Sequence, residues 1–136
     1  ILRKTIANLL DEADEALLED MASELNAKRS PDWIDIHNAK VIKYGNYLYM
    51  DCDLTLPWFY TIEKGHDEGA HLRQILEKKY ADRIQLTIHL DPCTVFEQSK
   101  CRSCICKDCK TRKAAFEQAE PITLATFVEH ANEVDR

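Results

Sequence analysis

The chain has 136 residues, of which 45% are hydrophobic, and it carries a formal net charge of −6. This length suits a single domain with one modest core and a tail. An acidic chain without a clustered basic face is not expected to bind nucleic acid, and no apolar run approaches the ~20 residues that a membrane helix needs.

An amphipathic helix is predicted over residues 3–27. Its apolar residues recur at three- and four-residue steps, and they are Ile6, Leu9, Leu10, Ala13, Leu17, Met21 and Leu25. The acidic residues between them indicate a solvated face rather than a metal patch. The sequence starts in helical register without a methionine, so we expect it to be part of a longer protein.

A β-hairpin is predicted next, over residues 33–59, with its turn at Gly45 and Asn46. The second strand alternates cleanly. Its inward residues are expected to be Leu48, Met50, Cys52, Leu54 and Leu56, and its outward residues Tyr47, Tyr49, Asp51, Asp53 and Thr55. Cys52 is therefore predicted to be a core cysteine.

A second helix and a third strand complete the expected core. Residues 61–80 form the helix, with Thr61 as N-cap, and its predicted buried stripe is Ile62, Leu72, Ile75, Leu76 and Tyr80. In the strand, Ile84, Leu86, Ile88 and Leu90 point inward, and Gln85, Thr87, His89 and Asp91 point outward. The order α-β-β-α-β predicts an α+β open-faced sandwich, with helices on one face of a small sheet.

The rest of the chain is expected to be an extension of this core. We predict one unit over residues 1–92 and a second, residues 93–136, made of a cysteine-rich loop and a C-terminal helix. Residues 111–120 have helical composition. Further on, Leu124, Phe127, Val128 and Ala131 fall at helical spacing, so this last helix should pack on something.

Four metal-ligating residues share the outward face of the predicted sheet: His37, Asp53, His89 and Asp91. Imidazole and carboxylate ligands together suit zinc or a similar divalent cation, so we expect a metal site here if the strands bring these residues together. His66 borders the buried stripe of the second helix and is equally consistent with a ligand or a packing histidine. His71 and His130 are interpreted as surface residues.

The cysteines predict a second metal site. Four of the six lie within nine residues and would close no useful disulfide loops, which favours metal binding in a reducing compartment. Cys101 and Cys104 have the spacing at which two thiolates clasp one tetrahedral ion, and Cys109 follows closely. Cys93 and Cys106 compete for the fourth position. A structural zinc is favoured over a sensing one, and a redox pair is disfavoured because the motif does not open a helix directly after a strand.

Three stretches of the sequence resemble a known family. The stretches WIDIHNAKVIKYGNYLYMDCDLTLP, TIEKGHDEGAHLRQILE and IQLTIHLDPC are similar to the cytosolic C-terminal domain of cation diffusion facilitator transporters, over about residues 4–93. The resemblance implies a metallochaperone-like (ferredoxin-like) fold, a V-shaped homodimer, and zinc or related ions near the dimer interface. It also implies a membrane domain upstream, and hence a location on the cytoplasmic side of the cell membrane (the inner membrane) as part of an integral membrane transporter.

The resemblance also implies a ligand set. His37, His66, His89 and Asp91 match the family's ligands in type, whereas position 53 is Asp53 where better-known members have histidine. Aspartate is a harder ligand, so zinc is not favoured outright over Mn²⁺, Fe²⁺ or Cd²⁺. Some members carry a cysteine-bearing extension after the DPC sequence, which favours Cys93 over Cys106 as the fourth thiolate.

These observations predict a regulatory and dimerisation domain of a proton-coupled divalent cation efflux transporter, without enzymatic activity, in which bound metal stabilises the closed dimer. A freestanding metallochaperone is one alternative. A small thiol- or metal-dependent oxidoreductase or hydrolase is another, although an exposed sheet face offers poor walls for an active site.

Overall fold

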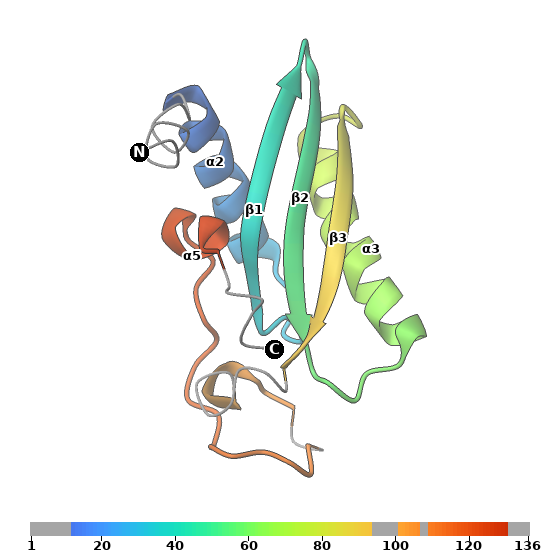
Figure 1. Cartoon of the computed structure of the whole chain (residues 1–136), viewed down its shortest axis with the longest axis vertical. Helices are drawn as coiled ribbons and strands as arrows, with labels where there is room; N and C mark the ends of the chain where they lie inside the picture. The colour runs from blue at the N-terminus through green and yellow to red at the C-terminus, as the bar shows by residue number, and fades with distance from the viewer. Residues whose placement is uncertain (1–11, 94–100, 107–108, 131–136) are drawn as a thin grey trace.

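The computed structural model describes residues 12–93, 101–106 and 109–130. Helix α2 (Glu12–Lys28) is followed by strands β1 (Asp35–Tyr44) and β2 (Tyr47–Leu56), helix α3 (Ile62–Lys79), strand β3 (Ile84–Pro92) and the short helix α5 (Leu124–Val128). The three strands form one sheet in the order β1-β2-β3. In Figure 1, α2 and α3 lie behind the sheet and α5 lies beside β1. The predicted α-β-β-α-β order and α+β class are confirmed.

The sheet is mixed because its two connections differ. β1 and β2 are antiparallel and joined by the predicted two-residue turn, which lies between the paired residues Tyr44 and Tyr47. Gly45 takes a φ of 62° at the first turn position, a conformation that glycine adopts without steric cost. β2 and β3 are parallel, with α3 as the crossover that parallel strands require.

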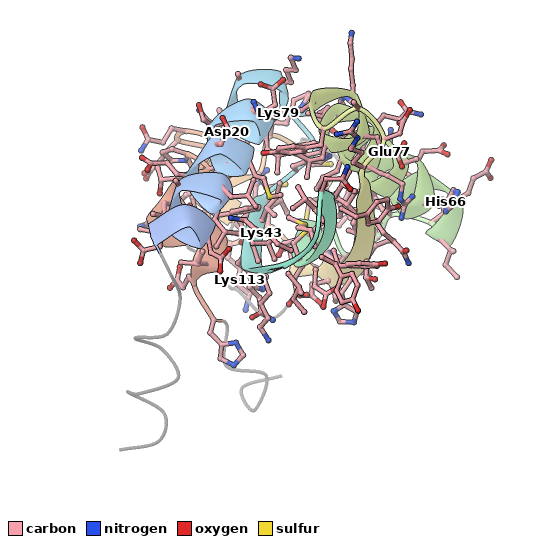
Figure 2. The ribbon with its side chains drawn as sticks, turned by 90° about the horizontal axis from the view of Figure 1, so that it is seen from above. Asp20, Lys43, His66, Glu77, Lys79 and Lys113 are labelled. Atoms are coloured by element: carbon pink, nitrogen blue, oxygen red, sulfur yellow. The ribbon has the colours of Figure 1, made fainter. Side chains whose placement is uncertain are left out.

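The core lies between the sheet and the two long helices. The inward residues of β2 are buried as predicted, with Leu48 at the margin, and Cys52 is among them. In α2 the buried face is centred on Leu18, Met21, Ala22 and Leu25, so Leu18 takes the place predicted for Leu17, which is only partly buried. The predicted apolar positions from Ile6 to Leu10 lie outside the described residues. Figure 2 shows Asp20 of α2 and Lys79 of α3 near each other, and their side chains form an ion pair of 3.3 Å between the helices.

Helix α3 follows the prediction except at its first turn. Thr61 is the N-cap and accepts a hydrogen bond from the Lys64 amide. Ile62 was expected in the buried stripe but is 92% exposed. The helix approaches the sheet through Gly65 instead, where an added Cβ would lie 3.1 Å from the Leu90 side chain. The contact with the sheet therefore begins one turn later than predicted.

The segment after Cys109 corrects a second prediction. Residues 111–120 form no helix, because tertiary hydrogen bonds hold this backbone instead: the amides of Glu117 and Gln118 both donate to the Arg102 carbonyl. The segment is mostly exposed, so it has no buried apolar face that would stabilise a helix. The last helix does form and pack. Phe127 is fully buried, and with Ile122 it joins the core cluster.

No helix in the described part of the chain combines the length and the hydropathy needed to cross a membrane.

Candidate metal centre

The strand register brings the predicted polar residues side by side. His37 of β1 pairs with Asp53 of β2, and Asp53 pairs with His89 of β3, so these three residues form a row across the sheet. A second row lies next to it, in which Asp35 pairs with Thr55 and Thr55 with Asp91. We call His37, Asp53, His89 and Asp91 the polar cluster. It lies on the face of the sheet opposite α2 and α3.

A β-bulge is responsible for the first row. Counted back from the Tyr44 and Tyr47 pair, a regular hairpin would set His37 opposite Leu54, which faces the core. The register instead shifts between His37 and Lys40, which adds one residue to β1 and pairs His37 with Asp53. Asn38 lies in the bulge with a φ of 55°, and asparagine tolerates this left-handed conformation better than most residues. The bulge thus turns His37 to the outer face.

Distances within the polar cluster match the needs of a small cation. The His37 Nε2 atom lies 3.6 Å from an oxygen of Asp53 and 3.7 Å from an oxygen of Asp91. One ligand atom from each of these three residues lies within 4.8 Å of the others, and all three residues are buried. His89 approaches from the solvent side, with its Nδ1 atom 3.1 Å from Asp91 and 3.7 Å from Asp53. These distances confirm the prediction that the four residues lie close together on one face of the sheet.

Two further residues orient His37. Its Nδ1–H group donates to Asp35 at 2.7 Å, and the Thr55 hydroxyl donates to the same Asp35 oxygen at 2.9 Å. This arrangement fixes the tautomer in which Nε2 carries the lone pair, as outer carboxylates do for metal-binding histidines. Asp35 and Thr55 were not predicted as part of the site, although Asp35 shares strand parity with His37 and Thr55 shares it with Asp53.

The surroundings of His37 change its acidity. Burial alone would lower the pKa of His37, but the hydrogen bond to Asp35 and the charges of the three neighbouring carboxylates outweigh burial, so its pKa lies above the usual value. A proton on His37 therefore balances part of the negative charge when no cation does. A divalent ion must compete with that proton.

This pKa predicts how stability depends on pH. Without added metal, and with chelator present, the free energy of unfolding should fall as pH rises from about 6.5 through the raised pKa of His37. The sign follows because the folded state holds the proton more tightly than the unfolded state, so the stabilisation is complete only below the unfolded pKa. Urea unfolding at several pH values measures this. His37→Gln should flatten the dependence, and an equal slope in both proteins would contradict the assignment.

The remaining predicted ligands lie elsewhere. His66 is exposed on α3, and Figure 2 shows it pointing outward from that helix. It is therefore not a packing histidine, and in the single chain it does not join the polar cluster, so its role as a ligand stays a prediction. His130 is exposed, as predicted, and its Nδ1 atom lies 3.0 Å from the side-chain amide oxygen of Asn38. Asn38 in turn donates to Asp53 at 3.3 Å, which places the end of the C-terminal segment beside the polar cluster.

The cysteines divide into three groups. Cys52 is fully buried in the core, and burial raises its pKa. Four others line one cavity, which we call the thiol pocket: Cys93, Cys101, Cys104 and Cys109. Burial raises the pKa of Cys93 and of Cys104, whereas the hydrogen bond with Thr111 lowers that of Cys109. Cys106 does not line the thiol pocket.

Comparisons with known proteins place this geometry in a family. Residues 12–93 match the family model described as cation efflux protein, cytoplasmic domain. Among solved structures, the metal-bound C-terminal domain of the CzcD transporter from Thermotoga maritima is similar with a TM-score of 0.54 and 19% identity, over 62% of this chain and 95% of that one.

Two further structures share the fold at 19% identity and a TM-score of 0.52. A cytosolic domain of a cation diffusion facilitator family protein is matched over 60% of this chain and 95% of its own, and a structure of the transporter CzrB over 57% and 93%. The comparison with curated proteins gave no match. Since the family model covers more than half of the residues, the chain belongs to the cation efflux (cation diffusion facilitator) family, of which it carries the cytoplasmic domain.

Proposed function

We propose that this cytoplasmic domain is the metal-responsive dimerisation domain of a proton-coupled divalent cation efflux transporter, and that it has no catalytic role. The observation that supports this most is the buried part of the polar cluster, the His37 imidazole and the carboxylates of Asp53 and Asp91, whose ligand atoms lie within 4.8 Å of one another. Buried charges of one sign are costly unless they are paired or bind a cation.

The donor set fits a divalent cation of borderline hardness. His37, Asp53, Asp91 and the more exposed His89 would hold the ion, with Asp35 and Thr55 supporting His37. Two imidazoles and two carboxylates suit Zn²⁺, and they also suit Mn²⁺, Fe²⁺ or Cd²⁺, because the carboxylates make the site harder than an all-histidine site. Protonated His37 balances only part of the negative charge of the buried carboxylates. A bound divalent ion would balance more of it.

The same outer face carries the features expected of a dimer contact. Ile42 and Tyr49 pair across β1 and β2 on this face, and they are 65% and 43% exposed. Tyr44, also on this face, is 77% exposed. Exposed apolar residues gathered on one face indicate a protein contact, and a second copy of the chain is the partner that the family assignment favours.

Charge explains why the metal would control this pairing. Each chain carries a formal charge of −6, so two acidic copies repel each other at long range. Neutralising the carboxylates of the polar cluster reduces this repulsion at the face where the copies would meet. Metal occupancy would then shift the population towards the closed dimer, in proportion to the difference in affinity between the two states.

Sedimentation of the 136-residue chain tests the proposal. We expect added zinc to increase the dimer fraction at low ionic strength, and Ile42→Glu to decrease it by placing a charge on the contact face. Ile62→Glu serves as the matched control, because it adds the same charge at a 92% exposed position of α3, away from the outer face of the sheet. A chain that stays monomeric with and without zinc, at concentrations where a weak dimer would form, would count against the proposal.

A further inference from the structure

Three of the four cysteines of the thiol pocket lie outside the part of the chain that the family model covers, and Cys93 lies at the end of that match. Pro57 and Phe59, which are inside the match, also line the pocket. Its four cysteines come from three separate places: the residue after β3, the turn containing Cys101 and Cys104, and the irregular segment at Cys109. All four are free thiols rather than disulfides. In Figure 1 this region lies below the end of the sheet where β2 and β3 terminate.

The size of the pocket restricts what it can hold. Its volume is about 20 Å³, which is enough for one ion or one water molecule and too small for an organic ligand. Four thiols around so small a space match the ligand number and type of a closed tetrahedral site for a soft or borderline ion.

The four sulfur atoms are not gathered within 4.8 Å of one another as the ligand atoms of His37, Asp53 and Asp91 are, so an ion would have to draw them together. The backbone around the pocket nevertheless has features that suit sulfur ligands. The Cys104 amide donates to the Cys101 carbonyl at 3.2 Å, which closes a tight turn, and both residues line the pocket. The Lys113 amide donates to the Cys101 sulfur at 3.4 Å. A backbone donor to sulfur is most favourable when the sulfur is a thiolate, as it is when bound to a metal.

Arg112 holds the backbone around the pocket through hydrogen bonds and places a positive charge beside the thiols. Arg112 lines the pocket, and its guanidinium donates to the carbonyls of Cys101, Cys104 and Cys106, and to that of Ala114. Four thiolates around a divalent ion leave a net charge of −2, so a fixed cation beside them is favourable. Because Arg112 bonds the backbone of the thiol turn from eight or more residues along the chain, it holds this turn in register with the Cys109 segment.

We propose that Cys93, Cys101, Cys104 and Cys109 bind one structural Zn²⁺ ion that fastens the C-terminal segment to the end of the sheet. Cys106 is not a ligand, because it lies outside the pocket. The segment after Cys109 has no regular structure before α5 and buries little apolar surface, so metal binding would supply folding energy that packing does not. The site is independent of the polar cluster, whose ligands come from other residues.

Zinc stoichiometry of the 136-residue chain tests this assignment. Native mass spectrometry after dialysis against dilute buffer should show one retained zinc in the wild type. The same ion should be retained in Cys106→Ser, the matched control, and lost in the Cys101→Ser, Cys104→Ser double variant. Far-UV circular dichroism checks that α2, α3 and the sheet survive in each.

Cobalt substitution gives a second readout that does not depend on retention. Wild type and Cys106→Ser should give the absorption of tetrahedral thiolate-bound Co²⁺, and Cys93→Ser should lose intensity. Retained zinc in the double variant, or loss in Cys106→Ser with no change in Cys93→Ser, would overturn the ligand assignment. An Asp53→Asn, Asp91→Asn variant should keep this ion, which separates failure of the thiol site from failure of the proposed regulatory site.

Discussion

Asp53→Asn combined with Asp91→Asn should weaken reversible zinc binding by about 100-fold or more. Loss of an outer hydrogen-bonding partner of a metal ligand already costs about 10- to 100-fold in affinity, and these two residues are themselves placed to bind the ion. Their oxygens lie 3.6 and 3.7 Å from the same His37 nitrogen, so a single ion between them would contact both. Asparagine keeps the shape of each side chain but removes its charge.

The matched control for this pair is Asp51→Asn. Asp51 lies on the same strand and the same face as Asp53 but is exposed, and it pairs with Lys40 rather than with the polar cluster. Isothermal titration calorimetry is done on chains whose thiol pocket already holds zinc, so that it measures only the reversible zinc binding at the polar cluster. Equal zinc affinity in the double variant and in Asp51→Asn would show that the polar cluster is not the binding site.

Phe127→Ala should lower the free energy of unfolding by about 3–5 kcal/mol, the usual cost of removing a fully buried phenylalanine. Helix α5 has five residues and cannot be stable alone, so its position depends on this side chain. The Asn38 amide donates to the Glu129 carbonyl just after α5 at 2.8 Å. Loss of the Phe127 anchor should therefore also speed hydrogen exchange at Asn38, beside the polar cluster.

Val128→Ala is the comparison for this variant, because Val128 is the next residue in α5 and is 39% exposed. It should change stability by much less and leave exchange at Asn38 slow. Urea unfolding and amide exchange followed by nuclear magnetic resonance measure both quantities. Equal stability of the two variants would mean that α5 does not depend on its buried contact.

Strand parity was enough to predict the outer face of β2 and β3, because alternation within a regular strand depends only on position. It placed Asp53, His89 and Asp91 on the outer face and Cys52 in the core, and the structure confirms these positions. His37 was also predicted to face outward, and it does, but its position depends on the β-bulge. Register was not available from the sequence. A regular hairpin closed at Gly45 would have turned His37 inward, and only the bulge at Asn38 pairs it with Asp53.

The wrong predictions share a cause, which is that contacts with residues distant in the sequence override the local pattern. Residues 111–120 have helical composition, but local propensity is a weak preference, and the hydrogen bonds of Arg112 and of the Arg102 carbonyl determine the backbone there. Ile62 fits the helical period but lies one turn before the helix meets the sheet. His130 is exposed as predicted, but its contact with Asn38 joins residues 92 positions apart, and no local pattern in the sequence indicates it.

Anomalous diffraction at the zinc edge, from crystals of the 136-residue chain grown with zinc, would show whether the polar cluster binds the ion. We expect a peak within bonding distance of His37 Nε2 and of carboxylate oxygens from Asp53 and Asp91, the three ligands that the structure holds within 4.8 Å of one another. Crystals that contain zinc at the thiol pocket or on the surface, with no peak at the polar cluster, would contradict this expectation.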